Sequence, residues 1–328
     1  MAPSTMRAAR IEQLGGSDVV KLAEVPVPEP RKGQVRIRVE AVGLNYSDIM
    51  IREGRYIDRV PLPYVMGREL AGTIDALGEG VASLPIGTRV VATLPGGALA
   101  EYAVAPAAGL VPCPEGFSPE QGASFLIQGI TAIHCLDLVA LQPGQTVLIH
   151  AAAGGVGTLA VQIARSRGLR VLGTASSAEK LRTIEELGGT AIDYTRDDWV
   201  SRVLAATEGR GAAAILESVG GDVLVRSFRE ALAVFGHLVI FGCASGDVRK
   251  LSAIEILESN RTVSGYYLGS FFPDHWDRVA AATAELLRLI GEGTVRPLVG
   301  RVFPLDEAAA ALDHLQNRQS VGKVVVKL

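Results

Sequence analysis

The stretch TVLIHAAAGGVG, residues 146–157, decides the fold of this chain. Residues 147–149 have the length and branching of a buried parallel strand, and a Pro143-Gly144 turn precedes them. Past the glycines, apolar residues recur at helical spacing, at Val156, Leu159, Ala160 and Ile163. A helix that begins here points its free N–H groups and the positive end of its dipole at the glycine turn. The stretch therefore predicts a site for an anionic phosphate, in particular the pyrophosphate of a dinucleotide.

The small residues of the turn follow the G-x-G-x-x-G pattern of dinucleotide-binding folds with one change. Aligned to that pattern, the chain has Ala152, Gly154 and Gly157, so alanine replaces the first glycine. A second strand at residues 170–174 follows at the distance that a βαβ unit requires. The residues expected to line the phosphate site are Ala153, Gly154, Gly155, Val156 and Gly157. The alternative is a purely structural glycine turn.

The tip of the second strand indicates which dinucleotide binds. NAD-selective folds place an Asp or Glu there, about 20 residues past the glycines. This chain has TASSAEK at residues 174–180, without a carboxylate at the tip. Ser176, Ser177 and Lys180 suit a 2′-phosphate, with Thr174 in the same predicted group, so we expect NADPH. Glu179 weighs against this choice, and a serine that only caps the following helix is compatible with either cofactor.

Composition limits the classes of function. A chain of 328 residues suits two domains. The net charge is −3 and the basic residues are scattered, so neither a nucleic acid nor an anionic membrane is an expected partner. Three dispersed cysteines predict reduced thiols and a cytoplasmic protein. We see no apolar signal core, and no uninterrupted apolar stretch reaches the roughly 18 residues of a membrane span.

The pattern changes near residue 121. Before it, short strands alternate apolar and polar residues, as at 35–41, which predicts an antiparallel sheet or barrel. After it, a helix is followed by strands near 146–150, 169–174, 191–194, 213–217 and 237–242, alternating with helices. Such alternation predicts a parallel sheet with right-handed crossovers. A long helix at 276–290, a short strand at 302–303, a helix from 307 and a last strand at 323–327 follow, and we expect the last strand to return to the first domain.

Several motifs together resemble one known family. They are GLNYSD (43–48) with GRY (54–56), GRELAG (67–72), GITA (129–132), HAAAGGVG (150–157) and IDY (192–194). On these motifs the chain resembles, nearly end to end, the medium-chain dehydrogenase/reductase superfamily in its zinc-independent quinone oxidoreductase branch. The resemblance implies an α/β protein with a GroES-like, β-barrel-type catalytic domain from residues 1–122 and 266–328. A Rossmann domain with a doubly wound parallel sheet is expected at 123–265.

Comparison with the zinc alcohol dehydrogenases of that superfamily predicts no metal site. A catalytic zinc needs three protein ligands of the Cys, His or carboxylate kind. Ser47 lies near the position of their first cysteine, Arg68 replaces the histidine of their Gly-His-Glu motif, and the cysteines of their structural zinc lobe are missing. Without a Lewis acid, hydride must go to an acceptor that is already electron-poor, such as a quinone, an enone or an enoyl thioester.

Two residues are expected to take part in the chemistry. Hydride transfer leaves negative charge on the acceptor, so a group must donate a proton or a hydrogen bond. Tyr56 is the main candidate, because it matches the proposed proton donor of mitochondrial-type enoyl thioester reductases; the alternative is that it only lines the pocket. Asn45 is expected between the nicotinamide ribose and the substrate, or else serves only the backbone turn. Asp48 and Arg68 are expected to form a structural ion pair or to anchor loops.

The resemblance also implies further cofactor contacts. Thr131 is expected near the nicotinamide end, Tyr194 near the 2′-phosphate, Phe241, Gly242 and Cys243 along the nicotinamide half, and Leu268 at the carboxamide. Val219 and Arg318 complete the set, although Arg318 is equally well explained as a solvated helix-end charge. The thiol of Cys243 is expected to be a small apolar filler rather than a nucleophile.

Three functions follow from these features. The first is an NADPH-dependent reductase of quinones or small enones, and the second is an enoyl-CoA or other enoyl thioester reductase with Tyr56 as proton donor. The third is a non-catalytic NADPH-binding protein, crystallin-like or nucleic-acid-binding. Asn45, Tyr56 and the glycine turn weigh against the third function, as does the lack of a basic patch. A homodimer is implied by the family alone.

Overall fold

The computed structural model describes residues 3–82 and 84–328, which divide into two compact units. Unit 1 takes Met1–Ile127 with Pro297–Leu328, and unit 2 takes Gln128–Arg296. The first domain is therefore assembled from both ends of the chain, around an inserted second domain.

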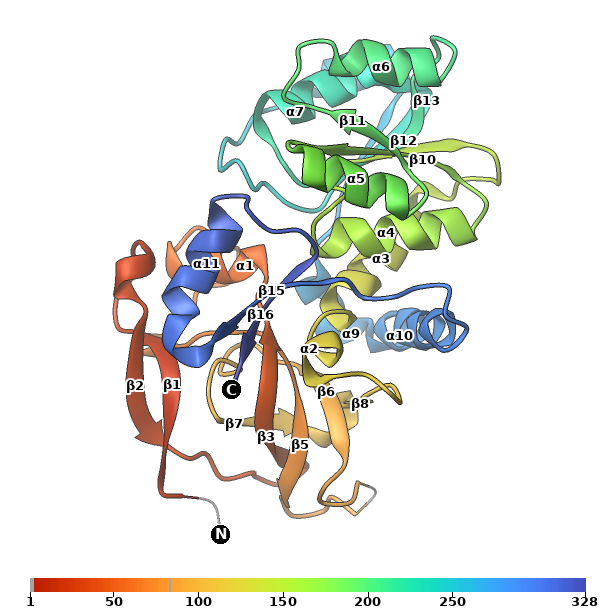
Figure 1. Ribbon diagram of the computed structural model, residues 1–328. Helices are drawn as coiled ribbons and strands as arrows, with labels where there is room; N and C mark the ends of the chain where they lie inside the picture. The colour runs from red at the N-terminus through yellow and green to blue at the C-terminus, as the bar shows by residue number, and fades with distance from the viewer. Residues whose placement is uncertain (1–2, 83) are drawn as a thin grey trace. The chain divides into compact units, whose positions relative to one another are not determined.

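Unit 2 is built on a parallel sheet of six strands in the order β11-β10-β9-β12-β13-β14 (Figure 1). In chain order this is 3-2-1-4-5-6, the doubly wound dinucleotide-binding arrangement, and the direction of winding reverses between β9 and β12. The strands are β9 (Thr146–Ile149), β10 (Arg170–Ala175), β11 (Thr190–Asp193), β12 (Ala212–Glu217), β13 (Leu232–Ile240) and β14 (Thr262–Gly265). All four residues of β9 are buried, as expected for the central strand of a covered parallel sheet.

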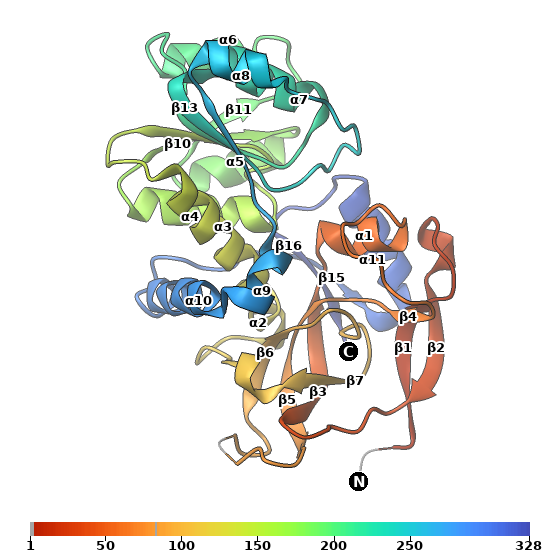
Figure 2. The ribbon, with the colours of Figure 1, turned by 180° about the vertical axis from the view of Figure 1, so that it is seen from behind.

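Helices connect these strands and cover the sheet, with α5 in front of the strands in Figure 1 and α8 in front of them in the reverse view of Figure 2. A large apolar cluster takes residues from the five strands β9 to β13 and packs them against Trp199, Val203 and Phe228. The helices are α3 (Leu126–Val139), α4 (Gly155–Ser166), α5 (Ala178–Glu186), α6 (Trp199–Ala206), α7 (Gly221–Arg226), α8 (Ala253–Ser259), α9 (Phe271–Asp274) and α10 (Trp276–Gly291).

Unit 1 contains two β-sheets. Strands β2, β1 and β4 form a small antiparallel sheet, and a seven-stranded sheet runs β15-β16-β3-β5-β6-β8, with β7 also paired to β3. The last strand returns to the first domain as predicted, because β16 pairs antiparallel with β3, where blue and red-orange ribbons lie side by side in Figure 1. The elements are β1 (Thr5–Ile11), β2 (Lys21–Pro26), β3 (Gln34–Gly43), α1 (Tyr46–Arg52), β4 (Tyr64–Val65), β5 (Glu69–Leu77), β6 (Arg89–Thr93), β7 (Tyr102–Pro106), β8 (Val111–Pro112), α2 (Pro119–Gly122), β15 (Val299–Pro304), α11 (Ala308–Gln316) and β16 (Lys323–Lys327).

Strand β3 departs from the simple alternation of its sequence at one residue. Arg38 is exposed between buried neighbours, as the alternation predicts, but Arg36 is also buried. Its guanidinium forms ion pairs with Asp75 at 3.0 Å and Glu29 at 2.9 Å. A charged side chain can be buried at this position because two carboxylates neutralise it.

The compact units differ from the domain boundaries expected from sequence. Residues 266–296, expected in the first domain, belong to unit 2, and residues 123–127 belong to unit 1. The reason lies in packing between helices: a side chain at Gly129 of α3 would collide with Leu286 of α10, so the two helices are in close contact. The helical pattern of the sequence predicts which face of α10 is apolar. It does not predict which other element that face packs against.

Within residues 3–82 and 84–328, one helical stretch, Pro119–Val139, is long and apolar enough to cross a membrane. An 18-residue window of it has a mean hydropathy of 1.4, and 83% of that window is buried inside the protein, so packing accounts for its apolar composition.

Candidate functional site

The predicted phosphate site, residues 152–157, is called the cradle. It joins the end of β9 to the first turn of α4. Gly154 is the N-cap of this helix of 12 residues, and no side chain caps it. Free N–H groups at the first turn of a helix are therefore left for an anion. Residues Gly154, Gly155 and Val156 are half-buried, whereas Ala152, Ala153 and Gly157 are buried.

Two glycines explain how an alanine fits at the first position of the cradle. A Cβ at Gly157 would lie 2.3 Å from the carbonyl oxygen of Ala151, so helix α4 packs directly on the turn. A Cβ at Gly173 of β10 would lie 2.8 Å from the Cβ of Ala152. The space that the missing first glycine normally provides is thus supplied across the sheet by Gly173.

His150, the residue after β9, is held by two buried hydroxyl groups. Its ring is buried and contacts the hydroxyl of Thr174 at 2.8 Å through Nδ1 and the hydroxyl of Ser227 at 2.7 Å through Nε2. Burial lowers the pKa of His150 to about 3, so the ring is neutral and joins β9 to β10. The hydroxyl of Thr174, expected to serve the cofactor, is fully buried and hydrogen-bonds this histidine instead.

The expected cofactor residues of unit 2 follow one edge of the sheet. Parallel strands end at the same edge, and a doubly wound sheet binds its ligand there, at the reversal between β9 and β12. The cradle follows β9, Ser176 to Lys180 follow β10, Tyr194 follows β11, and Val219 follows β12. Phe241, Gly242 and Cys243 follow β13, and Leu268 lies shortly after β14.

Residues 176–180, expected at the 2′-phosphate, differ in their surroundings: Ser177 is the N-cap of α5, whereas Ser176 and Lys180 are half-buried polar side chains. Ser177 caps α5 by accepting the N–H of Lys180 at 3.4 Å. Ser176 and Lys180 are half-buried, whereas Glu179 is exposed. The Asp193 carboxylate, at the end of β11, accepts the N–H of Thr195 at 3.0 Å and its hydroxyl at 2.6 Å. Tyr194 lies at the next strand end and donates its N–H to Ala175.

Glu217 shapes the loop after β12, and sequence analysis did not identify it. One carboxylate oxygen accepts the N–H groups of Val219 at 2.6 Å and Gly220 at 2.9 Å. The other oxygen is buried without a hydrogen-bond partner, and burial raises the pKa of this carboxyl. No pattern in the sequence distinguishes this glutamate from any polar residue that ends a buried strand.

Of the remaining expected residues, Cys243 lies against this loop, where a Cβ at Gly220 would be 2.7 Å from its sulfur. Cys243 is half-buried, and its thiol is 3.5 Å from the carbonyl of Asp247, in keeping with a filler role. Thr131 is on α3 and is buried. Asn45, Tyr56 and Arg318 lie in unit 1. Arg318 is exposed between α11 and β16.

In unit 1, Asn45 belongs to a buried network of charges. It precedes α1 and donates its backbone N–H to Asp48 at 2.8 Å. Its side-chain oxygen accepts a hydrogen bond from the ammonium of Lys323 at 2.8 Å, and the same ammonium is 2.9 Å from Glu69. Lys323 and Glu69 are almost fully buried. This network fixes the orientation of the Asn45 amide, and sequence analysis missed both of its charged members.

Asp48 occupies an unusual electrostatic environment. It is fully buried, and one of its oxygens has no hydrogen-bond partner. Burial raises its pKa to about 6, against the stabilising N–H of Asn45 and the charges of Lys323 and Arg68. No salt bridge joins Asp48 to Arg68 in the part of the chain that the structure describes; Asp58 is the carboxylate at 3.9 Å from Arg68. Of the two expected roles for Asp48 and Arg68, the structure thus favours loop anchors over an ion pair.

Tyr56 lies beneath a guanidinium. The guanidinium of Arg68 is 5.2 Å from the centre of the Tyr56 ring. Only 16% of the Arg68 side chain is exposed, so its positive charge acts in a partly desolvated place. Such a charge stabilises negative charge that develops on or near the phenol oxygen.

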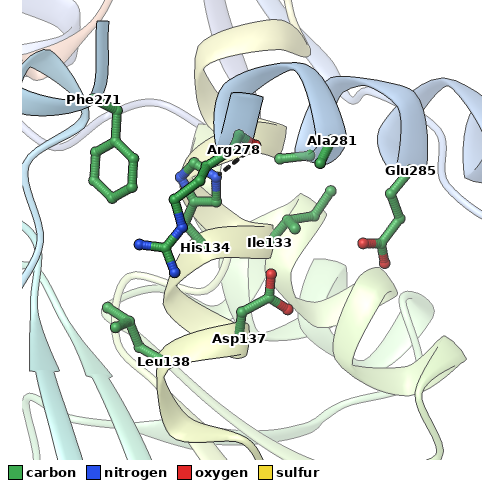
Figure 3. A pocket seen from close by; sticks show the side chains of 9 residues that line it. Ile133, His134, Asp137, Leu138, Phe271, Arg278, Ala281 and Glu285 are labelled. Atoms are coloured by element: carbon green, nitrogen blue, oxygen red, sulfur yellow. Dashed lines mark hydrogen bonds between the residues drawn. The ribbon is translucent and has the colours of Figure 1, made fainter. Parts of the chain in front are cut away.

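A separate cavity of about 240 Å³ lies among α3, α9 and α10, where Figure 3 shows its side chains. Its two carboxylates, Asp137 and Glu285, both pair with Arg167, at 2.8 and 3.1 Å. None of the expected site residues lines it. Across residues 3–82 and 84–328, no group of three or more His, Cys, Asp or Glu side chains is placed to hold a metal ion.

Comparisons with known proteins agree with this geometry. A family model described as an alcohol dehydrogenase GroES-like domain matches residues 31–115, and one described as a zinc-binding dehydrogenase matches residues 187–326. A quinone oxidoreductase of Pseudomonas aeruginosa is 36% identical over 316 residues, covering 95% of this chain and 96% of its own length. The human synaptic vesicle membrane protein VAT-1 homolog is 34% identical over 342 residues, covering 98% and 86%.

A solved structure of a relative has a similar fold. The quinone oxidoreductase from Thermus thermophilus, whose complex with NADPH is also known, superimposes with a TM-score of 0.86 at 37% identity. The match covers 98% of this chain and all of that chain.

Proposed function

The chain belongs to the medium-chain dehydrogenase/reductase superfamily, in its zinc-independent quinone oxidoreductase branch, and we propose that it is an NADPH-dependent reductase of quinones or small enones. The observation that carries this proposal is the uncapped N-terminus of α4 at the reversal point of the sheet, with the expected cofactor residues along the same edge. The NADPH complex of the Thermus relative supports the choice of cofactor.

The residues of unit 2 suit this cofactor. Gly157 has no room for a Cβ, so the turn that faces the pyrophosphate packs directly on its helix. Ser176 and Lys180 offer a hydroxyl and an ammonium where an NAD-selective fold has a carboxylate. When bound, NADPH would supply the hydride.

The residues of unit 1 would stabilise the charge left on the reduced acceptor. Asn45 is held in one orientation by Lys323, so its amide is a fixed polar contact for substrate. Tyr56 would donate a proton or hydrogen bond, and Arg68 would stabilise the negative charge that develops when it does. This set of groups suits an acceptor that becomes an oxyanion when reduced, such as a quinone or an enone.

An enoyl thioester reductase is the second candidate function, because Tyr56 matches in sequence the proposed proton donor of mitochondrial-type enoyl thioester reductases. The experiment that separates the candidates measures NADPH oxidation with quinones, enones and several enoyl-CoAs, with and without a metal chelator. We expect turnover of conjugated acceptors that chelation leaves unchanged. Abolition of all activity by the chelator would refute the proposal, and NADPH binding without turnover of any acceptor would favour the non-catalytic alternative.

Substitution of Tyr56 tests its role directly. Tyr56→Phe is expected to slow enoyl thioester reduction by roughly 100-fold, the size of a general-acid contribution, because the α-carbon needs a proton. Quinone reduction should change by no more than about threefold, since water can protonate the product oxyanion. Tyr102→Phe is a matched control, because Tyr102 also lies under an arginine, Arg36, at 5.6 Å. Equal enoyl rates for Tyr56→Phe and wild type would remove Tyr56 from the mechanism.

We also propose a cytoplasmic homodimer. Strand β14 ends the parallel sheet and pairs only with β13 among the described strands, so one edge is open to another copy. Phe235 and Leu257 are 82% and 70% exposed, which suits an interface. The three cysteines are unpaired, as expected in a reducing compartment. Light scattering should give twice the chain mass of 34.5 kDa, and a monomer at micromolar concentration would contradict the dimer.

A further inference from the structure

The cavity of about 240 Å³ in unit 2 lies between α3 and α10, with Phe271 of α9 beside it (Figure 3). On α10 two small residues, Ala281 and Ala282, lie between Arg278 and Glu285. The spacing i, i+3, i+4, i+7 places all four on one face of the helix, and the two alanines leave the space next to α3 unfilled. An engineered cavity of about 150 Å³ in another protein binds benzene, so this one has room for a substituted benzene ring.

One end of the cavity carries a guanidinium without a carboxylate partner. The guanidinium carbon of Arg278 is 5.8 Å from the centre of the Phe271 ring, and Phe271 stacks on His134 with ring centroids 4.7 Å apart. Among the described residues, the Arg278 side chain forms no salt bridge. Burial lowers the pKa of His134, so at neutral pH the histidine adds no second charge here. Such an arginine can hold a carboxylate with two parallel hydrogen bonds.

The other end of the cavity is acidic. Asp137 of α3 and Glu285 of α10 both pair with Arg167, at 2.8 and 3.1 Å. Two carboxylates share one guanidinium, which leaves an excess of one negative charge. Figure 3 shows Glu285 on the far side of the cavity from Phe271. This end suits a hydrogen-bond donor and disfavours a second anion.

The walls between the two ends are apolar, formed by Ile133, Leu138, Ala281 and Ala282. A helix rises 1.5 Å per residue, so the Cα atoms of Arg278 and Glu285 are about 10 Å apart. That separation spans a benzene ring with a polar group at each end.

We propose that this cavity is a second ligand site, which binds a small aromatic carboxylate with a hydrogen-bond donor at the opposite end of its ring. The carboxylate contacts Arg278, the ring fills the space beside the two alanines, and the donor faces Glu285. The site shares no residue with the proposed cofactor site, so the inference is independent of the proposed function.

Ligand-observed NMR titration of the whole protein with three probes tests the proposal. They are 4-hydroxybenzoate, its neutral amide 4-hydroxybenzamide, and terephthalate, which has a carboxylate at each end of the ring. We expect 4-hydroxybenzoate to bind with a dissociation constant of about 1 mM or below. The amide should bind at least about tenfold more weakly, because it forms no charge-assisted hydrogen bonds with the guanidinium. Terephthalate should also bind at least about tenfold more weakly, because its second carboxylate meets the acidic end.

Variants of α10 test the two groups that define the site. Arg278→Met should weaken binding of 4-hydroxybenzoate at least about tenfold, and Arg278→Lys should weaken it less, because lysine keeps the charge without the two parallel donors. Arg288→Met is the matched control, since Arg288 pairs with Glu292 on the same helix outside the cavity and its loss should leave the affinity unchanged. Ala281→Phe should fill the cavity and abolish binding. Ala280→Phe, at an exposed position outside the cavity, should not.

The outcomes separate this site from the cofactor site and from damage to the fold. The affinity for 4-hydroxybenzoate should be the same with and without saturating NADPH, and every variant should unfold at the wild-type temperature. Displacement of the probe by NADPH would overturn the inference, because it would place the probe in the cofactor site. Equal affinities for the acid and its amide, or for wild type and Arg278→Met, would also overturn it, as would tight binding of terephthalate.

Discussion

At the scale of the residue, Gly157 is the position of the cradle that tolerates least change. A methyl group there would lie 2.3 Å from the oxygen of Ala151 and 2.6 Å from the Cα of Ala152. Both are backbone atoms, which cannot move without shifting the turn. Sequence analysis found this residue from its spacing, and the structure adds the reason why only glycine fits.

Substitution of Gly157 should therefore affect cofactor binding. Gly157→Ala is expected to weaken NADPH binding by at least about tenfold, because the displaced turn no longer presents its N–H groups correctly. Gly291→Ala, at the end of α10, meets no atom within 4 Å and should leave affinity and thermal stability unchanged or slightly improved. Fluorescence titration and thermal unfolding measure both effects; equal affinities for the two variants would contradict the steric explanation.

His150 makes stability depend on pH in a defined direction. Its pKa is about 3 in the folded protein and about 6.5 when unfolded, so the unfolded state alone binds the proton between these values. The free energy of unfolding should fall as the pH is lowered through this window, by about 2 kcal/mol at pH 5 for this group.

Urea unfolding of the whole protein at pH 7.5 and pH 5 checks the contribution of His150. His150→Asn cannot titrate, so it should lose less stability than the wild type between these pH values. Asp48 contributes the opposite slope, because its raised pKa of about 6 means that the folded state binds the proton from about pH 4 to pH 6. That term is the same in both proteins and cancels in the comparison. The same acid loss in both would rule out His150 as the source.

At the scale of the element, the end of β10 and the start of α5 serve two separate purposes. Ser177 accepts the N–H of Lys180 and caps the helix, whereas the half-buried side chain of Lys180 is proposed to bind the 2′-phosphate. The sequence pattern could not separate a cap from a phosphate ligand, because serine serves in both roles.

Two variants separate these roles. Ser177→Ala should lower the free energy of unfolding by about 1 kcal/mol and leave the ratio of NADPH to NADH affinity unchanged. Lys180→Met should reduce that ratio by roughly tenfold, because only NADPH carries the 2′-phosphate. Chemical unfolding and titration with both cofactors give the two readouts. A change in the affinity ratio for Ser177→Ala alone would reverse the assignment.

The accuracy of the predicted limits differs among the strands and helices of unit 2. Strand β9 and helix α10 lie within about a residue of their predicted limits, because buried runs and long periodic stretches give strong local signals. Strand β13 begins at Leu232, five residues before its expected start, and β14 was not predicted. Both strands contain exposed or half-buried residues, so their patterns resemble loops.

At the scale of the whole molecule, a buried ion pair joins the two segments of the chain that make up unit 1. Lys323 of the last strand and Glu69 of β5 are 254 residues apart in sequence and 2.9 Å apart in space. Glu69 also accepts the N–H of Ile127 at 3.0 Å. The pair therefore links β16 to β5 beside Asn45, whose side-chain oxygen accepts a hydrogen bond from the same ammonium.

Removal of one charge should cost more than removal of both. Lys323→Met leaves the Glu69 carboxylate buried without its cation and should lower the free energy of unfolding by about 3–5 kcal/mol. The double variant Lys323→Met/Glu69→Leu should recover most of this loss. A double-mutant cycle in urea measures the coupling, and equal losses in the single and double variants would show that the charge plays no part.

Residue spacing and short motifs were enough to predict the glycine turn after β9, the parallel sheet and the family, because each depends on residues that lie close together in the chain. The return of the last strand to the first domain was also expected, and the pairing of β16 with β3 confirms it. Contacts between other distant elements could not be predicted in this way: residues 266–296 pack with unit 2, and Lys323 holds Asn45. The tertiary structure also brings the Tyr266 hydroxyl to 2.9 Å from the ring of His134, 132 residues away in sequence. Periodicity specifies which face of an element is buried, but contacts between distant elements depend on how those faces pack together.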